Sequence, residues 1–325
     1  MPSLAAAACG GQDLLAAMAT DDPDRHAAII AAADGVENGE ARFWQVTGPD
    51  GGVSHLFGTY HDTASSETIS APVRTAFAGA ERLVMEMSDE ELARMEQRIA
   101  TDPSFSFREV PVSATMLMDG IDENERAIVE QALAARGLTL PVAGRLQPWL
   151  LFSLFGVPAC QLAEMAGGAE VMDRELAAEA AEAGKPVLGL EGYEEALSTF
   201  TRIPEDDAVL MIRDYLALVP LEEDMRATLL AQYGAGRIGV IQAFTEDLGA
   251  AYAPGDPAAV KARNDMLMQG LLNDRNLAWM DRLLPYLQGG GAFVAVGALH
   301  LPGEVGLVTL LRDAGYRVEP LGEDG

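Results

Sequence analysis

Two stretches of this sequence share the pattern Gly-x-x-His, one at residues 58–61 and the other at residues 297–300. Each follows a short apolar run that is typical of a buried strand. The chain contains 4 histidines, and two of them, His61 and His300, stand at the same offset from a glycine. Imidazoles serve as general bases and as metal ligands. We therefore expect the fold to bring these two strand ends together in one site.

Two further apolar segments carry a carboxylate at their ends, namely Glu86 within residues 82–87 and Glu191 at the close of residues 185–191. Open α/β sheets bind ligands beyond the carboxyl ends of their strands. Two imidazoles with one or two carboxylates suit a divalent transition metal with an open coordination position. They equally suit metal-free hydrolysis, with a histidine as general base oriented by a glutamate. Both chemistries remain open at this point.

The glycines that precede the two site histidines have a physical role of their own. Gly58 and Gly297 allow the backbone to turn sharply, or to approach another strand closely, where it leaves the sheet. The other two histidines stand in less reactive contexts, His55 within a strand and His26 in a helix. We expect both of these to be structural.

A polar cluster near the C-terminal end places Arg275, Asn276 and Trp279 within about one helical turn. Arg275 could clamp a substrate carboxylate or orient one of the strand-end glutamates. A surface ion pair with a neighbouring aspartate is the alternative. Directly after His300, residues 301–304 are expected to start a helix, whose free amides could stabilise a developing oxyanion.

The order of the predicted elements indicates the fold class. Strands are expected at residues 43–47, 53–57, 82–87, 185–191, 292–296 and 316–320, whereas most of the rest is helical. This predicts an α/β (α+β) fold, with a central mixed β-sheet built from both chain ends and a large helical insertion at about 89–288. Residues 1–40 are expected to form an N-terminal helical segment, and residues 41–325 a single domain.

Composition excludes some classes of partner. The 325 residues include 22 basic and 50 acidic side chains, a formal net charge of −28, which opposes binding to nucleic acid and to anionic membrane surfaces. No apolar run reaches the ~20 residues of a membrane span. A peptide or a small molecule is the expected substrate. Apolar helices around Trp149 and Phe155 could cap the site or form a homodimer face, but core packing is the expected role.

The N-terminal residues bear on the cellular compartment. Small residues before Cys9 are similar to the tail of a secretory signal, which predicts a periplasmic or secreted chain whose signal has been trimmed. A lipoprotein anchor at Cys9 and an ordinary Ala-rich cytosolic start are the alternatives. In an exported chain Cys9 and Cys160, the 2 cysteines present, would form one disulfide, whereas two buried thiols are the alternative.

The motifs resemble the TraB/GumN family, which includes the Tiki proteases. The similarity is carried by residues 56–61, 190–191, 275–279, 294–304 and 310–318, and it extends over roughly 43–320. It implies a fold similar to those of ChaN and erythromycin esterase. The residues around Cys9 and Cys160 also look like exported bacterial members, which implies a disulfide and a periplasmic location. Gly192 departs from the threonine that many bacterial members have after the glutamate.

The same resemblance implies a metalloprotease-like site. Carried over to this sequence, His61, Glu86 and His300 would be catalytic and would bind a divalent ion such as Mn, Co or Zn. The supporting or substrate-binding residues would be Glu191, Arg275, Asn276 and Tyr60. We therefore expect a metal-dependent, peptidase-like hydrolase. The alternatives are a metal-free esterase-like hydrolase and a non-enzymatic periplasmic ligand-binding or polysaccharide-export accessory protein.

Overall fold

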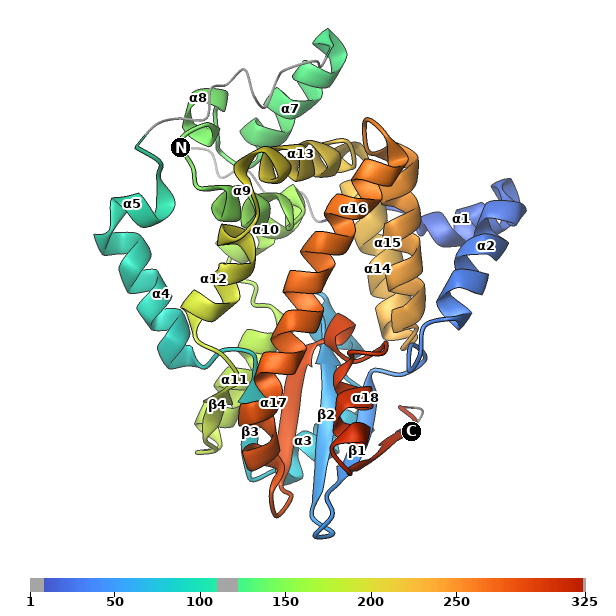
Figure 1. The fold of residues 1–325 in the computed structure, drawn as a ribbon, viewed down its shortest axis with the longest axis vertical. Coiled ribbons are helices and arrows are strands. Elements are labelled where there is room, and N and C mark those ends of the chain that lie inside the picture. The colour runs from blue at the N-terminus through green and yellow to red at the C-terminus, as the bar shows by residue number, and fades with distance from the viewer. Residues whose placement is uncertain (1–8, 110–121, 324–325) are drawn as a thin grey trace.

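The fold is described from a computed structural model that places residues 9–109 and 122–323. Its centre is a six-stranded sheet with the order β4-β3-β5-β2-β1-β6 (Figure 1). The strands are β1 (Phe43–Thr47), β2 (Val53–Thr59), β3 (Arg82–Met85), β4 (Val187–Gly189), β5 (Ala292–Gly297) and β6 (Arg317–Pro320). This arrangement confirms the predicted mixed α/β sheet, in which strands from both ends of the chain pair side by side.

Four neighbouring strands of this sheet run parallel. β5 pairs in parallel with both β2 and β3, and β3 pairs in parallel with β4, whereas β1 is antiparallel to β2 and β6. Within this register Thr59 lies opposite Gly297. The two Gly-x-x-His motifs therefore leave the sheet at adjacent positions on the same edge. β5 is covered on both faces, which explains its continuous apolar sequence.

Helices cover both faces of the sheet. α3 (Ala71–Gly79) and α11 (Met172–Glu182) pack on one face, and α17 (Asp274–Leu287) and α18 (Leu307–Asp313) pack on the other. α17 contributes Trp279, Leu283 and Leu287, whose spacing of four residues keeps them on one side of the helix. Arg275 and Asn276 stand one turn earlier on α17, and this position places them at the carboxyl edge of the sheet.

A helical half lies beyond this edge, on the upper side of Figure 1. It contains α7 (Glu123–Ala135), α8 (Leu140–Ala143), α9 (Pro148–Phe155) and α13 (Glu205–Leu216), which share one apolar cluster. α1 (Leu14–Asp21), α2 (Pro23–Asp34) and α15 (Ile238–Tyr252) share another. The remaining helices are α4 (Asp89–Thr101), α5 (Pro103–Ser106), α10 (Ala159–Ala166), α12 (Tyr193–Thr201), α14 (Glu222–Gly234) and α16 (Pro257–Met268).

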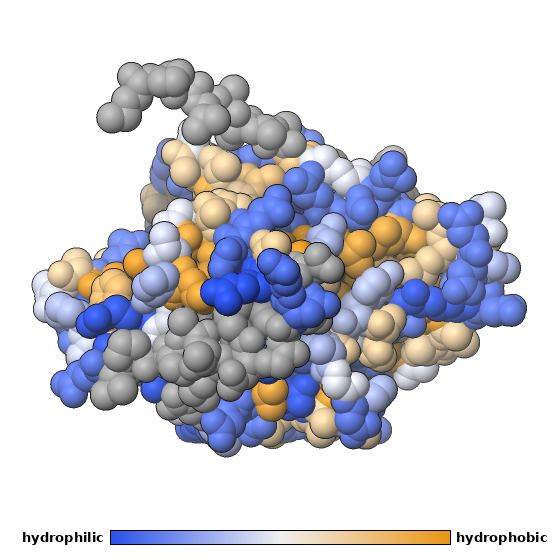
Figure 2. Space-filling view, turned by 90° about the horizontal axis from the view of Figure 1, so that it is seen from above, coloured by the Kyte–Doolittle hydropathy of each residue, from blue (hydrophilic) through white to orange (hydrophobic). Residues whose placement is uncertain are grey.

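The face of the molecule seen from above carries many hydrophilic residues, with hydrophobic residues between them (Figure 2). Phe155 is buried in the cluster of α7, α8, α9 and α13, and the indole of Trp149 donates to the carbonyl of Phe105. Both residues thus pack in the interior. Among the placed residues no single helix is long and apolar enough to cross a membrane, although the bent pair α9–α10 passes that test by length and composition.

The expected start of one helix is wrong. A helix does not start at residues 301–304, because η4 (Ala298–His300) is a short 3₁₀ turn and α18 begins at Leu307. Gly303 has φ +91°, a left-handed conformation that interrupts helical geometry. Its amide donates to the carbonyl of Glu37 at 2.7 Å. The predicted oxyanion-stabilising helix terminus next to His300 is therefore absent from this segment.

The expected disulfide is present. Cys9 and Cys160 are bonded across a sequence separation of 151 residues, tying the N-terminal segment to α10. Because the Cys9 sulfur takes part in this bond, it is not available for a lipid anchor. Most of the predicted signal remnant, residues 1–8, lies outside the described residues.

Candidate functional site

The expected site residues gather at the carboxyl ends of the four parallel strands. His61 follows β2, Glu86 follows β3, Glu191 follows β4, and His300 follows β5 within η4. In Figure 1 these strand ends face the helical half. This is the position at which open α/β sheets bind their ligands.

Arg275 lies at the centre of the site, between two carboxylates. Its Nη2 donates to Glu86 Oε2 at 2.6 Å, and its Nε donates to both oxygens of Glu191 at 3.0 and 3.1 Å. The guanidinium lies 4.7 Å from the ring of Trp279, whose Nε1 donates to Glu191 Oε2 at 3.0 Å. Arg275 therefore binds the strand-end glutamates rather than a surface aspartate.

The electrostatics of the two glutamates differ. Burial by itself would raise the pKa of Glu86, but the nearby imidazole of His300, the Arg275 guanidinium, His61 and the Gly297 amide outweigh it and hold this pKa well below its usual range. Burial raises the pKa of Glu191, and its bonds to Arg275 and Trp279 offset part of this effect. Glu86 is thus a fixed anion at the edge of the site.

His300 is a buried, neutral imidazole. Its Nδ1 lies 2.7 Å from Asn276 Oδ1, while Asn276 Nδ2 donates to the carbonyls of His300 and Val305. Asn276 thereby assigns the proton to Nδ1 and leaves Nε2 as an acceptor for Arg275 Nη1 at 3.3 Å. Burial, reinforced by the positive charge of Arg275, lowers the pKa of His300 to about 4. The Trp279 ring packs against the imidazole at a tilt of 35°, with 4.4 Å between the ring centroids.

His61 has the opposite character. Its side chain is 59 % exposed, and its Nδ1 lies 2.7 Å from Asp173 Oδ2. The other oxygen of Asp173 accepts from Thr59 Oγ1 at 2.7 Å. The charge of Asp173 raises the pKa of His61 to about 9. Nε2 makes no hydrogen bond with any residue of the described ranges, so it is free to meet a substrate or water.

Gly297 is the point on which these groups converge. A Cβ added there would lie 3.2 Å from Glu86 Oε1, 3.5 Å from His300 Cδ2 and 3.8 Å from His61 Nε2. The Gly297 amide also donates to Glu86 Oε1 at 2.8 Å. The absence of a side chain at Gly297 therefore leaves open the space that the three expected catalytic residues border.

Gly58 has a different role, because it permits close packing. A Cβ at Gly58 would lie 2.8 Å from the Cα of Ala298, so the first motif could not lie against the second with any larger residue there. The Gly58 carbonyl accepts from the hydroxyl of Tyr233 at 2.7 Å. Tyr60 packs its ring on Tyr233 at 5.3 Å, on the core side of the chain.

Arg275 contacts two of the three residues that are expected to bind a divalent metal. Glu86 Oε2 and His300 Nε2 both face the Arg275 guanidinium, a permanent cation, whereas Glu86 Oε1 lies 3.7 Å from His300 Nε2 and borders the space at Gly297. His61 alone has the carboxylate-supported geometry common among metal-binding histidines. Within residues 9–109 and 122–323, no cluster of three or more His, Cys, Asp or Glu side chains has metal-binding geometry.

Two functional contacts were missed by sequence reasoning. Asp173 lies in the first turn of α11, an Ala- and Glu-rich helix in which one more acidic residue did not indicate a functional role. Gln161 of α10 donates to the carbonyl of His61 at 2.9 Å. Acidic residues are common in the first turn of a helix, so the sequence around Asp173 did not mark it as the partner of His61.

A pocket of about 340 Å³ adjoins the site on the side of α12 and α17. Glu191, Arg275 and Trp279 form the wall that it shares with the strand ends. The π-helical turn η3 (Gln269–Asn273) contributes Gln269 and Gly270 to the opposite rim. π-Helical turns are frequent at functional sites.

Comparison with known sequences identifies the family of this chain. The profile of the TraB/PrgY/gumN family matches residues 42–320. The uncharacterized protein YbaP of Shigella flexneri is 26% identical over 268 residues, which is 82% of this chain and 90% of that protein. YbaP of Escherichia coli K12 is 31% identical over 141 residues, 43% of this chain and 47% of that protein. The matched region contains all four parallel strands and their polar ends. The chain belongs to the TraB/PrgY/gumN family.

Proposed function

We propose that this protein is a hydrolase in which His61, supported by Asp173, activates water for attack on an ester or amide carbonyl. The observation that carries the proposal is the 2.7 Å contact between His61 Nδ1 and Asp173, with Nε2 left free beside an ionised glutamate. A histidine oriented by a carboxylate is the usual arrangement of a general base. This is metal-free hydrolysis with a histidine as general base, one of the two chemistries expected from the sequence.

The step uses groups that border the space at Gly297. A water molecule held by Glu86 Oε1 gives a proton to His61 Nε2 as its oxygen attacks the carbonyl carbon, and Asp173 stabilises the imidazolium that forms. The imidazolium then gives this proton to the leaving alcohol or amine as the carbonyl bond to it breaks. Arg275 acts as a positioning residue, because its donors are engaged by Glu86, Glu191, His300 and Leu271.

The divalent ion expected at His61, Glu86 and His300 stays a prediction, and a metal titration separates it from the metal-free mechanism. The protein is dialysed against a chelator and assayed on a panel of peptide and ester substrates, with and without added Mn, Co or Zn. Undiminished hydrolysis after chelation supports the metal-free mechanism. Hydrolysis that returns only with an added ion overturns it in favour of the metallohydrolase.

Matched histidine variants test whether the site is responsible. His61→Gln is expected to lose at least about a hundredfold in kcat/KM, the usual contribution of a general base. His26→Gln, on α2, serves as the control and is expected to keep full activity. If no substrate is turned over but a ligand binds and His61→Gln abolishes the binding, the non-enzymatic ligand-binding alternative replaces the hydrolase.

We further propose an extracytoplasmic location, periplasmic or secreted, which the Cys9–Cys160 disulfide supports because such bonds persist in oxidising compartments. The substrate class, peptide or small molecule, and a homodimer also stay predictions. Light scattering in solution measures the oligomeric state directly.

A further inference from the structure

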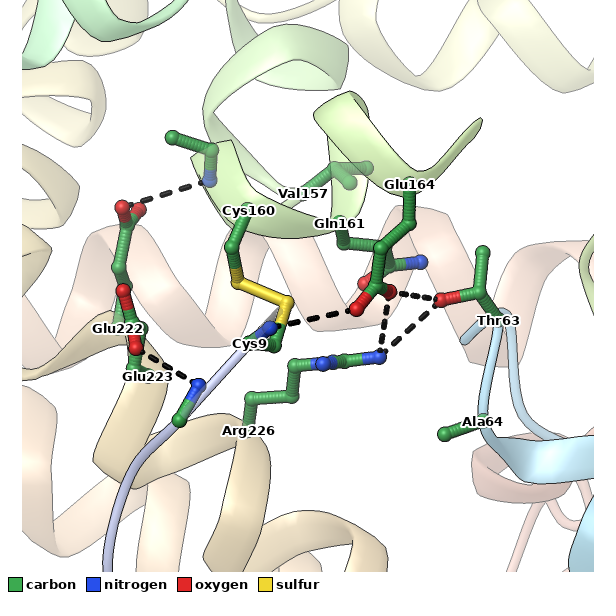
Figure 3. The surroundings of a disulfide bond; sticks show 12 residues. Cys9, Thr63, Ala64, Val157, Cys160, Gln161, Glu164, Glu222, Glu223 and Arg226 are labelled. Carbon is green, nitrogen blue, oxygen red and sulfur yellow. Dashed lines mark hydrogen bonds and ion pairs between the residues drawn. A yellow bond between two sulfur atoms is a disulfide. The ribbon is translucent and has the colours of Figure 1, made fainter. Parts of the chain in front are cut away.

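The Cys9–Cys160 disulfide lies near Thr63 and Ala64, which follow His61 in the same loop, and Glu164 contacts both Cys9 and Thr63 (Figure 3). On α10, the residue after Cys160 is Gln161, which is 2 % exposed and donates from Nε2 to the carbonyl oxygen of His61 at 2.9 Å. One turn further along, Glu164 Oε2 accepts from Thr63 Oγ1 at 2.5 Å. The disulfide-bonded helix thus holds the chain on both sides of position 62.

A buried ion pair holds the residue between His61 and Thr63. Arg226 of α14 donates to both oxygens of Asp62 at 2.6 and 2.7 Å, and both side chains are less than a tenth exposed. Its Nη2 also reaches Glu164 Oε2 at 3.1 Å. The three residues that follow Tyr60 are therefore each held by α10, by α14 or by both, and Figure 3 shows the contacts of the third, Thr63, with Glu164 and Arg226.

The N-terminal segment ties the two helices together. Cys9 is bonded to Cys160 of α10 and its amide donates to Glu164 Oε1 at 3.3 Å. The next residues attach to α14, through Gly10 N to Glu223 at 2.9 Å and Gln12 N to Asp224 at 2.7 Å. The segment therefore connects α10 to α14, covalently at α10 through the disulfide and by hydrogen bonds at α14.

α10 has little else to fix it. Gln161 is the one residue of this eight-residue helix that is fully buried, and α10 contributes no residue to the apolar clusters of the described chain. Most helical stability in proteins comes from packing an apolar face. The position of α10 therefore depends on the disulfide and on polar contacts.

We propose that α10 is the positioning element for His61 and that the Cys9–Cys160 disulfide locks it, so that reduction of this bond loosens the His61 loop and weakens catalysis. The inference rests on the proposed role of His61 in hydrolysis. Reduction by an external dithiol transfers two electrons and two protons, giving two cysteine thiols and the oxidised dithiol. Both cysteines are partly exposed, so a small dithiol can reach them.

The test follows the His61 ring by NMR, a readout that does not need a substrate. With 4 histidines in the chain, the ring signals are assigned from the His61→Gln and His26→Gln spectra. In the oxidised protein His61 is expected to titrate near 9. In the Cys9→Ser/Cys160→Ser variant, or after reduction, we expect this pKa to fall toward the ordinary 6.5 as the contact with Asp173 loosens. Where activity is measurable, kcat is expected to fall by about a hundredfold.

Gln161→Met tests the helix without touching the sulfurs. It keeps the length of the side chain but removes the N–H that binds the His61 carbonyl, so it is expected to lower the pKa of His61 while the disulfide stays intact. Gln131→Met, on the exposed side of α7, is the control and should leave the titration unchanged. Circular dichroism confirms that each variant is folded at the temperature used.

The outcomes separate the two proposals. A His61 titration that is the same in oxidised, reduced and Gln161→Met proteins overturns the positioning role of α10, whatever the activity. A titration that shifts as expected in a protein that hydrolyses nothing supports the positioning role and removes the proposed hydrolase activity.

Discussion

At the scale of single residues, the two histidines of the paired motifs have opposite protonation. His61 is partly exposed and has its pKa raised by Asp173, whereas His300 is buried and has its pKa lowered to about 4. The two equivalent motifs thus give one group, His61, with a pKa of about 9, and one, His300, that stays neutral at neutral pH. Their environments, and not their sequence patterns, divide the roles.

The substitution Asp173→Asn is expected to lower the pKa of His61 from about 9 toward 6.5, because it removes the negative charge that favours the imidazolium. Since the base form of His61 is the active one, kcat/KM in the parent rises with pH up to about 9. In the variant this rise should move to lower pH, with a reduced plateau because the imidazole is no longer held. A pH–rate profile of both proteins measures the shift, and an unchanged profile contradicts the assignment.

The same pair predicts a pH dependence of stability. The pKa of His61 is higher in the folded protein, about 9, than the 6.5 expected in the unfolded chain. The ion pair with Asp173 therefore stabilises the fold fully below pH 6.5, and this stabilisation is lost as the pH rises through about 9. Asp173→Asn should therefore cost more unfolding free energy at pH 6 than at pH 10. Denaturant unfolding at the two pH values measures the difference. A cost that is equal at both contradicts the ionic pairing.

Arg275→Met is expected to destabilise the fold by about 3–5 kcal/mol, because it leaves Glu86 and Glu191 as adjacent buried charges without their partner. The loss should shrink as the pH falls below the ordinary carboxyl value of 4.5, where protonation removes those charges. Arg275→Lys is the comparison: it keeps the charge but lacks the planar fork, so an intermediate loss is expected. Urea unfolding above and below pH 4.5 measures the loss of unfolding free energy in each variant. A loss that does not change with pH contradicts the ion-pair account.

At the scale of elements, the two motifs meet because β2 and β5 are adjacent and parallel. Gly58 and Gly297 occupy similar positions in sequence but differ in what surrounds them. The space at Gly297 opens onto the polar groups of the site, whereas Gly58 lies against the backbone of η4. Gly297 leaves space beside the polar groups of the candidate site, whereas Gly58 permits the close packing of β2 against η4.

Gly297→Ala is expected to keep the fold but to lower activity by at least about tenfold, because the new methyl group occupies the space between Glu86, His300 and His61. Gly58→Ala is its counterpart and is expected to destabilise the fold by about 1–3 kcal/mol through overpacking against Ala298. Thermal unfolding and kcat/KM, measured on both variants, distinguish the two roles. Equal effects of the two substitutions on stability would contradict this division.

At the scale of the whole molecule, the net charge of −28 opposes compaction through repulsion among acidic side chains. We expect the melting temperature to rise from low salt toward about 1 M NaCl, where the screening length is only about 3 Å. The site ion pairs are buried and less screened, so they should not offset this gain. Calorimetry in NaCl and KCl measures the effect, and a melting temperature that falls with salt contradicts it.

The sequence by itself determined the strands, the paired motifs and the side chains at the four strand ends. These depend on local patterns, namely apolar runs, glycines and the polar residues that follow them. The mixed sheet was also predicted from the sequence, whereas for the Cys9–Cys160 bond and for the partner of Arg275 the sequence left alternatives open that the tertiary structure decided. The start of the last helix was predicted wrongly at residues 301–304, because a left-handed Gly303 and its long-range contact to Glu37 delay the helix to Leu307.

Only the tertiary structure decided which partner each site residue has. Asp173 reaches His61 from 112 residues away, and Gln161 reaches it from 100. Arg275 faces Glu86 across 189 residues. The protonation states of these side chains follow from such distant charges and from burial. No local pattern encodes them, because electrostatic energy depends on distance in space and on the loss of solvent.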